Sequence, residues 1–252
     1  MAGKLEDKVC VITGGSLGIG RGTAKECAAE GGRVAVLDIH VEGGERTVGE
    51  IREAGGSAIF IETDVSRAGE VQAAVERVVE EYGKIDVLVN AAALQVQAPV
   101  LTEVAEEEWD TVMDINLKGP FLCSKYVIPE MLKRGRGAIV NVSSSVVLRG
   151  STFSLPYAVS KAGMIQLTKT TSSQFCEQGI RVNSVIPGLV DTPGAQGVEG
   201  KAGIFDEVAA GIPVGRAGQP EDIAKLVVYL VSDDAAYVSG TAVVIDGGRN
   251  AK

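Results

Sequence analysis

The sequence predicts an α/β fold, in which seven parallel strands form one doubly wound sheet with helices on both faces. Two observations lead to this prediction. Short and nearly continuous apolar runs recur along the chain, and the stretches between them place apolar residues at helical spacing. Strands that are apolar throughout are typical of parallel sheets, whose two faces are covered by crossover helices. The 252 residues suit a single domain, residues 1–252, with a sizeable core.

The expected elements alternate regularly along the chain. Apolar runs predict strands within residues 8–14, 33–39, 57–64, 85–91, 138–144, 180–188 and 242–248. The clearest intervening helix precedes the fourth strand, where one stripe contains Val71, Val75, Val78, Val79 and Tyr82. No internal repeat or linker interrupts the series, so right-handed crossovers can join all seven strands into one sheet.

Composition excludes several classes of function. The net charge is −9 with no basic block, which argues against nucleic acid or an anionic membrane as a partner. No apolar run reaches about 18 residues and the start lacks a secretory pattern, so we expect neither a membrane span nor a leader. Four scattered cysteines without a C-x-x-C pair favour a reduced cytoplasm. Because His40 is the only histidine, we expect no metal site.

A glycine-rich turn follows the first predicted strand and opens the first predicted helix. Its spacing is G-x-x-x-G-x-G, whereas the commoner dinucleotide fingerprint is G-x-G-x-x-G. Glycine lets the backbone turn sharply and approach a pyrophosphate, which then lies at the helix N-terminus. A tight turn without a ligand is the alternative. We expect a Rossmann-like dinucleotide site made by Gly14, Ser16, Leu17, Gly18, Ile19 and Gly20.

The second predicted strand ends in Asp38, followed by Ile39. A carboxylate at this position can accept hydrogen bonds from both ribose hydroxyls of an adenosine and would repel a 2′-phosphate. Neither Ser16-Leu17 nor Ile39 supplies a basic side chain to neutralise that phosphate. The residues therefore favour NAD over NADP; the alternative is that Asp38 is only a helix N-cap or a solvated strand end.

Proton-transfer chemistry is indicated by three residues. Ser144 follows the fifth strand, and Tyr157 and Lys161 are four residues apart in a helical stretch that begins with proline. Residues at i and i+4 share a helix face, so the ammonium should favour the phenolate. By itself Y-x-x-x-K is a weak pattern, which more often marks an exposed helix face.

Taken together, these features resemble the short-chain dehydrogenase/reductase family over essentially the full chain. The resemblance implies that Asp64 and Val65 contact adenine and that Asn90 also binds the cofactor. It implies that Asn116 holds a water linking Lys161 to solvent. It further implies that the nicotinamide carboxamide is received by Pro187, Gly188, Val190 and Thr192. One departure is that Ala91 and Ala93 replace the usual Asn and Gly of the Asn-Asn-Ala-Gly segment, which predicts an altered pocket shape with activity retained.

The resulting hypothesis is an NAD-dependent oxidoreductase that interconverts a secondary alcohol and its ketone. Its catalytic residues would be Asn116, Ser144, Tyr157 and Lys161, with Tyr157 as acid/base. A sugar, a polyol or a small cyclic alcohol is the expected substrate. Loops 93–100, 146–156 and 189–216 should form the pocket, in which Arg149 or Lys201 could meet a carboxylate. The other pocket candidates are Leu94, Gln95, Val96, Gln97, Val146, Leu148, Ser151, Phe153, Ser154 and Leu155.

Two alternatives stay open. A 3-oxoacyl carrier-protein reductase would use NADPH, against Asp38, and would need to bind an acidic carrier, for which Lys133, Arg134 and Arg136 form a local basic cluster. A dinucleotide-sensing protein without turnover would normally lack the complete Ser/Tyr/Lys set. The resemblance also implies a homotetramer or a dimer, joined through helices at 107–133 and 157–178 that carry Trp109, Met113, Phe121 and Phe175.

Overall fold

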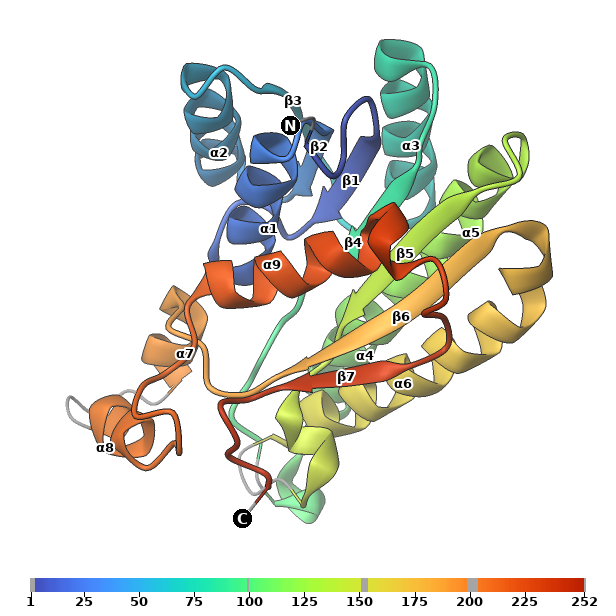
Figure 1. The fold of residues 1–252 in the computed structure, drawn as a ribbon. Helices are drawn as coiled ribbons and strands as arrows, with labels where there is room; N and C mark the ends of the chain where they lie inside the picture. Colours follow the sequence, from blue (N-terminus) through green and yellow to red (C-terminus); the bar gives the residue numbers. More distant parts are fainter. Residues whose placement is uncertain (1–2, 99, 151–153, 199–203, 252) are drawn as a thin grey trace.

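One parallel sheet forms the centre of the molecule in the computed structural model, which describes residues 3–98, 100–150, 154–198 and 204–251 (Figure 1). All seven strands pair in parallel in the order β3-β2-β1-β4-β5-β6-β7, which confirms the predicted sheet. In chain order the strands are β1 Val9–Thr13, β2 Arg33–Asp38, β3 Ser57–Glu62, β4 Val87–Asn90, β5 Gly137–Val142, β6 Ile180–Pro187 and β7 Ala242–Ile245. The order reverses between β1 and β4, where doubly wound folds bind ligands at the carboxyl ends of the strands.

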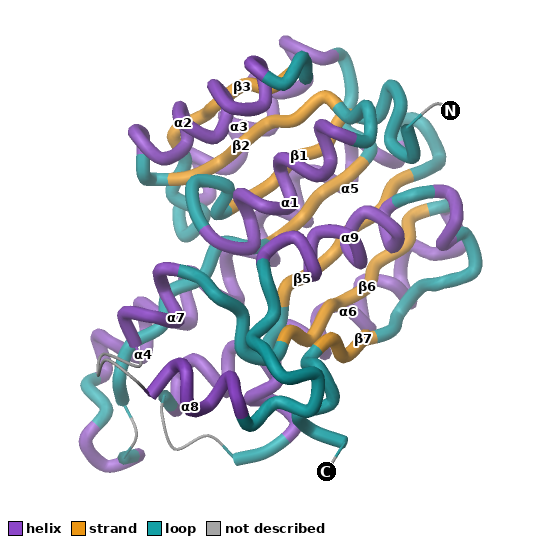
Figure 2. The backbone as a smooth tube through the Cα atoms, turned by 60° about the vertical axis from the view of Figure 1, so that its left-hand side comes forward, coloured by secondary structure: helices purple, strands orange, loops and turns teal. Residues whose placement is uncertain are grey.

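Helices cover both faces of the sheet (Figures 1 and 2). The helices on one face are α1 Gly18–Ala29, α2 Val41–Glu53 and α9 Pro220–Val231. The helices on the other face are α3 Ala68–Tyr82, α5 Gly119–Leu132 and α6 Leu155–Phe175, with α4 Glu106–Met113 packed against α6. Two short helices, α7 Pro193–Val198 and α8 Ile204–Ala210, lie beyond the carboxyl end of the sheet. No helix among the described residues is long and apolar enough to cross a membrane.

Alternation along each strand divides the core into two halves. In β1, Cys10 and Ile12 pack with residues of α1, α2 and α9, whereas Val9 and Val11 pack with residues of α3 and α5. Successive strand side chains point to opposite faces, and both faces are covered, so every residue of β1 is buried. This double burial explains why the strands appear in the sequence as continuous apolar runs.

Local sequence features determine where α6 and α9 begin and where the helix at 107–133 is interrupted. Pro156 lies in the first turn of α6, where its missing N–H leaves no intrahelical bond unmade. At α9, Gln219 and Asp222 form a reciprocal capping box around Pro220. The predicted helix at 107–133 is α4 and α5 joined by a π-helical turn, Asp114–Lys118, and this turn contains the buried Asn116. Such bulges are frequent at functional sites because they turn side chains out of α-helical register.

Candidate active site

A cleft of about 1010 Å³ opens at the carboxyl ends of the strands. It extends past the ends of β1 to β6 and reaches Arg249 in the C-terminal segment. Both the glycine turn and the Ser144, Tyr157 and Lys161 group line it, so the structure brings the predicted nucleotide and catalytic residues into one site. Of the predicted residues, Asn90 and Asn116 are buried and support the cleft from behind.

The glycine turn allows the backbone to approach closely at each of its three glycines. A Cβ on Gly14 would lie 2.6 Å from Ala92 Cα, and one on Gly20 would lie 2.1 Å from the Gly14 carbonyl oxygen. Gly14 and Gly18 also have φ of +67° and +51°, a region that L-residues seldom adopt. Helix α1 begins at Gly18 without a side-chain cap or an acidic residue in its first turn. Its first N–H groups therefore fit the pyrophosphate of a dinucleotide.

Asp38 at the end of β2 faces the cleft and is fixed by two backbone donors. Its carboxylate accepts a hydrogen bond from Ser16 N at 3.0 Å and from His40 N at 2.9 Å. These bonds tie the strand end to the glycine turn. The interpretation of Asp38 as a simple helix cap does not hold, because His40 caps α2 through Nδ1, which accepts from Gly43 N. Ile39 is exposed and lines the cleft beside it.

The predicted adenine contacts, Asp64 and Val65, line the cleft after β3. The Asp64 carboxylate accepts hydrogen bonds from Ser66 N and Ser66 Oγ and pairs with Arg67 at 3.2 Å. Hydrogen bonds from Ser66 and the charge of Arg67 outweigh burial and lower the pKa of Asp64. Asp64 thus shapes the loop, while its neighbour Val65 packs beside Gly119 at the start of α5.

Polar side chains cross the buried sheet in one row just behind the cleft. Thr13, Asn90, Asn141 and Ser184 are paired in register on β1, β4, β5 and β6. Asn90 Nδ2 donates to Asn141 Oδ1 and Asn141 Nδ2 donates to Thr168 Oγ1, both at 2.8 Å. The bond to Thr168 anchors α6, the helix that carries Tyr157 and Lys161, to the sheet. Asn90 Oδ1 has no hydrogen-bond partner among the described residues.

Thr13 also explains how the chain tolerates alanine in the segment after β4. Thr13 Oγ1 accepts hydrogen bonds from Ala91 N at 3.1 Å and Ala92 N at 3.2 Å. These bonds use the backbone and need no side chain. Among the described residues Asp7 is the only non-glycine residue with positive φ, so Ala93 is unstrained in its place. The predicted change of pocket shape at Ala93 remains a prediction.

Backbone contacts fix the catalytic group at the end of β5 and the start of α6. Lys161 is 1% exposed, and its Nζ donates to the Val142 carbonyl oxygen at 2.8 Å. Ser143 Oγ donates to the Lys161 carbonyl oxygen at 2.9 Å. Lys161 Nζ lies 5.6 Å from the centre of the Tyr157 ring, so both side chains share a helix face as the spacing predicts.

Burial, and not the charge of Lys161, dominates the pKa of Tyr157 in this structure, so the lowering by Lys161 that the spacing predicts stays a prediction. Burial raises the pKa of Tyr157, against a smaller lowering by a hydrogen bond with Ser144. The same burial lowers the pKa of Lys161 to about 7, because its ammonium loses hydration without gaining a carboxylate partner. Burial is thus the largest influence on the pKa of both groups. A lysine with a pKa near neutrality can both hold and release a proton under ordinary conditions.

Asn116 anchors the loop after β4 to the helix layer. Its Oδ1 accepts from Leu94 N at 2.7 Å and its Nδ2 donates to the Leu94 carbonyl oxygen at 2.8 Å. Nδ2 also donates to Ser160 Oγ at 3.2 Å, one residue before Lys161. The Asn116 side chain thus links a wall of the cleft to the catalytic helix.

The segment after β6 turns sharply beside the glycine turn. A Cβ on Gly188 would lie 2.8 Å from Asp246 Cα, so only glycine fits against the C-terminal segment. Thr192 Oγ1 accepts from Ala195 N at 3.2 Å, and its methyl group lies next to Gly18. All four predicted residues, Pro187, Gly188, Val190 and Thr192, line the cleft.

The predicted substrate loops contribute only in part to the cleft. Of the pocket candidates, Leu94, Gln95, Val146 and Arg149 line it. Val96, Gln97, Leu148 and Leu155 lie outside its lining, and Ser154 is fully buried. Ser151, Phe153 and Lys201 lie outside the described residues. The predicted loop 189–216 contributes Pro193 and Ala195 to the lining, whereas sequence analysis missed Ile115 and Arg249. Ile115 shares the π-helical turn with Asn116, which was the only available signal.

Comparisons with known proteins agree with this geometry. The family model described as Enoyl-(Acyl carrier protein) reductase matches residues 14–250. The 3-oxoacyl-[acyl-carrier-protein] reductase FabG of Thermotoga maritima is 41% identical over 245 residues, 97% of this chain and 98% of the relative. The cis-4-hydroxycyclohexanecarboxylate dehydrogenase of Sinomonas cyclohexanicum is 38% identical over 246 residues, 97% of each chain. The crystal structure of levodione reductase superimposes with a TM-score of 0.93 at 34% identity, covering 98% of this chain and 99% of the other.

The glycine turn, the parallel sheet and these relatives define a dinucleotide-dependent oxidoreductase acting on a small molecule. The chain belongs to the short-chain dehydrogenase/reductase family.

Proposed function

We propose that the protein is an NAD-dependent dehydrogenase that interconverts a secondary alcohol and its ketone, with Tyr157 as acid/base. The observation that carries this proposal is the grouping of Ser144, Tyr157 and Lys161 in the cleft that also contains the glycine turn. A small cyclic alcohol, a sugar or a polyol is the substrate class. The relative that is named for a hydroxycyclohexanecarboxylate supports the cyclic member of this class.

Each residue of the site would have a separate role in the reaction. The bound dinucleotide supplies the hydride acceptor. Ser144 hydrogen-bonds the substrate oxygen, and Tyr157 takes the hydroxyl proton during oxidation. Lys161, with its pKa near 7 and its Nζ held by Val142 O, stabilises the phenolate and passes the proton onward. Asn116 keeps the Leu94 loop against this group and, as the family resemblance implies, supports the relay to solvent.

The preference for NAD rests on the charges around Asp38. Cationic side chains that line the described part of the cleft are Arg149, Lys161 and Arg249, which come from segments after β5, in α6 and after β7. The strand order places all three away from the end of β2. A 2′-phosphate beside Asp38 would therefore face a carboxylate without a compensating cation.

Reduction of 3-oxoacyl groups on a carrier protein is the second candidate, supported by the similarity to FabG. Lys133, Arg134 and Arg136, the predicted docking cluster, lie between α5 and the start of β5, at the amino edge of the sheet. The cleft opens at the opposite, carboxyl edge of the sheet, so this basic cluster does not lie at the entrance to the cleft. Lys133 also pairs with Glu130, and Arg134 lies near Asp86. These contacts favour the small-molecule alcohol.

We also propose that the chain forms a homotetramer, or at least a dimer. A shallow, mostly apolar groove between α4, the π-helical turn, α5 and α6 supports this. It is lined by Met113, Asp114, Leu117, Lys118, Phe121 and Leu167. Phe121 is 48% exposed, an apolar area that a second copy would cover.

A screen of cyclic and acyclic secondary alcohols with NAD⁺ and with NADP⁺ tests the proposal, with formation of the reduced cofactor as the readout. Reduction of a 3-oxoacyl thioester by NADH and by NADPH is measured in parallel. We expect alcohol oxidation with NAD⁺. If only the thioester is turned over, and NADPH is preferred, the second candidate replaces the first. If both cofactors bind and no substrate is turned over, the protein is a dinucleotide-sensing protein.

A further inference from the structure

Charged side chains that line the described part of the cleft are segregated by sign. Two are carboxylates, Asp38 and Asp64, and both follow strands of the β1–β3 half of the sheet. Three are cations, Arg149, Lys161 and Arg249, and all come from segments associated with β5 to β7. The strand order separates the two groups across the point where it reverses.

This division coincides with a division of tasks. The carboxylates lie on the side of the glycine turn, where the adenosine half of a dinucleotide would bind. The cations lie on the side of Ser144 and Tyr157, where the reacting oxygen of the substrate would bind. Lys161 is tied to Val142 O and to the tyrosine ring, which makes it part of the proton-transfer group. Arg149 and Arg249 are the two described lining cations that are not part of this group.

Arg249 lies in a hydrogen-bonded turn that follows β7. Asp246 accepts hydrogen bonds from Gly248 N and Asn250 N, each at 2.9 Å, and from the Asn250 side chain at 2.7 Å. Gly247 and Gly248 take φ of +64° and +83°, which the turn requires. The arginine backbone is fixed at one point while its side chain lines the cleft.

The turn is also joined to the segment that follows α8. Val214 N donates to the Gly247 carbonyl oxygen at 3.2 Å, and a Cβ on Gly247 would lie 2.7 Å from an Ile212 methyl carbon. Figure 2 shows α7, α8 and the C-terminal segment together at the end of the sheet where the cleft opens. Arg149 approaches from another direction, directly after the short 3-10 helix Ser145–Leu148 that follows Ser144. Two arginines from separate segments therefore line the half of the cleft that contains Ser144 and Tyr157.

We propose that the substrate is a secondary alcohol that carries a carboxylate, and that Arg249, assisted by Arg149, binds this carboxylate. The planar guanidinium matches a carboxylate through two parallel hydrogen bonds, which fixes the orientation as well as the charge. The inference rests on the proposed function, because that function places the alcohol carbon near Tyr157. It adds that the far end of the substrate is anionic.

Matched substrates test the charge directly. The wild-type protein is assayed with NAD⁺ on 4-hydroxycyclohexanecarboxylate and on 4-hydroxycyclohexanecarboxamide, and then on 3-hydroxybutyrate and 3-hydroxybutyramide. Within a pair only the charge changes. We expect at least a tenfold higher kcat/KM for the carboxylate of the pair that is turned over, mainly through KM, in line with one charge-assisted contact. High salt should narrow the gap.

Arginine variants locate the effect. Arg249→Gln should remove most of the preference for the carboxylate, because it lowers kcat/KM for the carboxylate more than for the carboxamide. Arg249→Lys should restore part of the preference, because a point charge without the planar fork remains. Arg149→Gln should have a smaller effect in the same direction. Arg77→Gln, on the exposed face of α3, is the matched control and should change neither substrate.

Each outcome decides between specific explanations. Oxidation of the alcohols without any preference for the carboxylate overturns this inference and leaves the proposed function standing. If no alcohol is turned over in either form, the proposed function itself fails. If Arg249→Gln weakens NADH binding as much as carboxylate turnover, the arginine serves the cofactor and the inference is wrong. The enzyme could also prefer acetoacetyl-CoA over the neutral N-acetylcysteamine thioester and show no preference for a carboxylate. That result would assign the cations to binding of a phosphopantetheine arm and would overturn this inference.

Discussion

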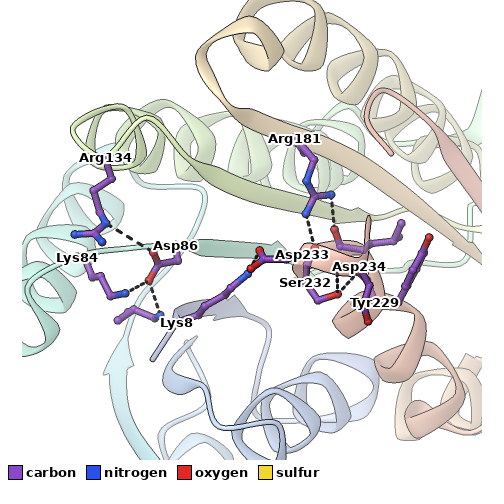
Figure 3. Close-up of polar contacts among 11 residues, drawn as sticks. Lys8, Lys84, Asp86, Arg134, Arg181, Tyr229, Ser232, Asp233 and Asp234 are labelled. Carbon is purple, nitrogen blue, oxygen red and sulfur yellow. Dashed lines mark hydrogen bonds and ion pairs between the residues drawn. The ribbon is translucent and has the colours of Figure 1, made fainter. Parts of the chain in front are cut away.

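Charged residues have different surroundings at the amino edge of the sheet, where the strands begin, and at the carboxyl edge, where they end. At the amino edge, Asp86 is 5% exposed and accepts from Val9 N at 2.9 Å and from Lys84 Nζ at 2.8 Å, with Arg134 nearby (Figure 3). Lys8 pairs with Asp233 at 2.6 Å in the same region. At the carboxyl edge, Lys161 is buried with no carboxylate partner among the described residues, and burial lowers its pKa to about 7.

Arg181 extends the amino-edge pattern to the end of α9. Its guanidinium donates to the carbonyl oxygens of Leu230 at 2.7 Å and Ser232 at 2.9 Å, at the helix end (Figure 3). It also donates to the Val238 carbonyl oxygen at 3.2 Å. Charged groups at the amino edge therefore have ion-pair or hydrogen-bond partners within the chain. At the carboxyl edge, Asp38 and Lys161 are instead held by backbone groups and line the cleft. We infer that the amino edge serves stability and the carboxyl edge serves chemistry, which gives each edge a different response to mutation.

The largest expected effect concerns the carboxyl edge. Tyr157→Phe should lower kcat by at least about 10²-fold, the usual loss when general acid–base help is removed. NADH affinity should stay near wild type because the ring is kept. Steady-state kinetics and a fluorescence titration with NADH give the two quantities. Tyr126→Phe, in α5 outside the cleft lining, is the control. Near-normal turnover of Tyr157→Phe would remove this tyrosine from its assigned role.

At the amino edge we expect a loss of stability instead. Asp86→Asn leaves Lys84, whose side chain is 14% exposed, without its carboxylate and should lower the free energy of unfolding by about 3 kcal/mol. Urea denaturation measures this change. Asp234→Asn removes the pair with Lys4, which is about half exposed, and should leave stability close to that of wild type because solvent screens the pair. Equal effects of the two substitutions would show that burial does not distinguish these pairs.

Cofactor choice tests the charge pattern of the cleft itself. Wild type should prefer NAD over NADP by more than about tenfold in kcat/KM, or about 1.4 kcal/mol. Asp38→Ala should narrow the difference mainly by weakening NAD, and adding Ile39→Arg should then improve NADP. Ile39→Arg alone is the control for the added charge. Equal use of both cofactors by wild type would contradict the role given to Asp38 and favour the carrier-protein reductase.

The smallest expected effect is a pH-dependent one between α1 and α2. Arg21 and Lys25 bind Glu50 and hold its pKa at about 2, below the ordinary value of 4.5. A lowered pKa stabilises the folded state fully above about pH 4.5, and the contribution is lost as the pH falls toward 2. Glu50→Gln should lower stability by less than about 1 kcal/mol at pH 7 and by less at pH 3. Urea unfolding at the two pH values measures it; a larger difference at pH 3 would reverse the assigned sign.

Much of this organisation was predictable from local sequence. Strands buried on both faces, the glycine turn and Asp38 at a strand end are features of neighbouring residues, and the structure confirms the predicted sheet. The balance of forces on Tyr157 was not predictable, because it depends on how completely α6 is covered and on which atom Lys161 contacts. The position of Arg249 in the cleft was also missed. It depends on a turn at the end of the chain that packs against the segment after α8.

Asn116 is another residue whose contacts could not be predicted from the sequence. The family resemblance identified it, but the bonds to Leu94 and Ser160 arise from a π-helical turn that no apolar periodicity indicates. The row of Thr13, Asn90, Asn141 and Ser184 appeared in the sequence only as single polar residues within or ending strands. Register between distant strands brings them together, so their role became visible only in the folded sheet.

The most direct test of the central claim is the turnover number per folded molecule, measured side by side for Tyr157→Phe and Asp86→Asn. Folded fractions come from urea titrations of the same samples. We expect Tyr157→Phe to be as stable as wild type and to have lost at least 99% of its turnover, since a 10²-fold loss leaves about one part in a hundred. Asp86→Asn should be less stable with full turnover per folded molecule. If Asp86→Asn loses turnover while folded, or Tyr157→Phe retains it, the assignment of chemistry to one edge and stability to the other is wrong.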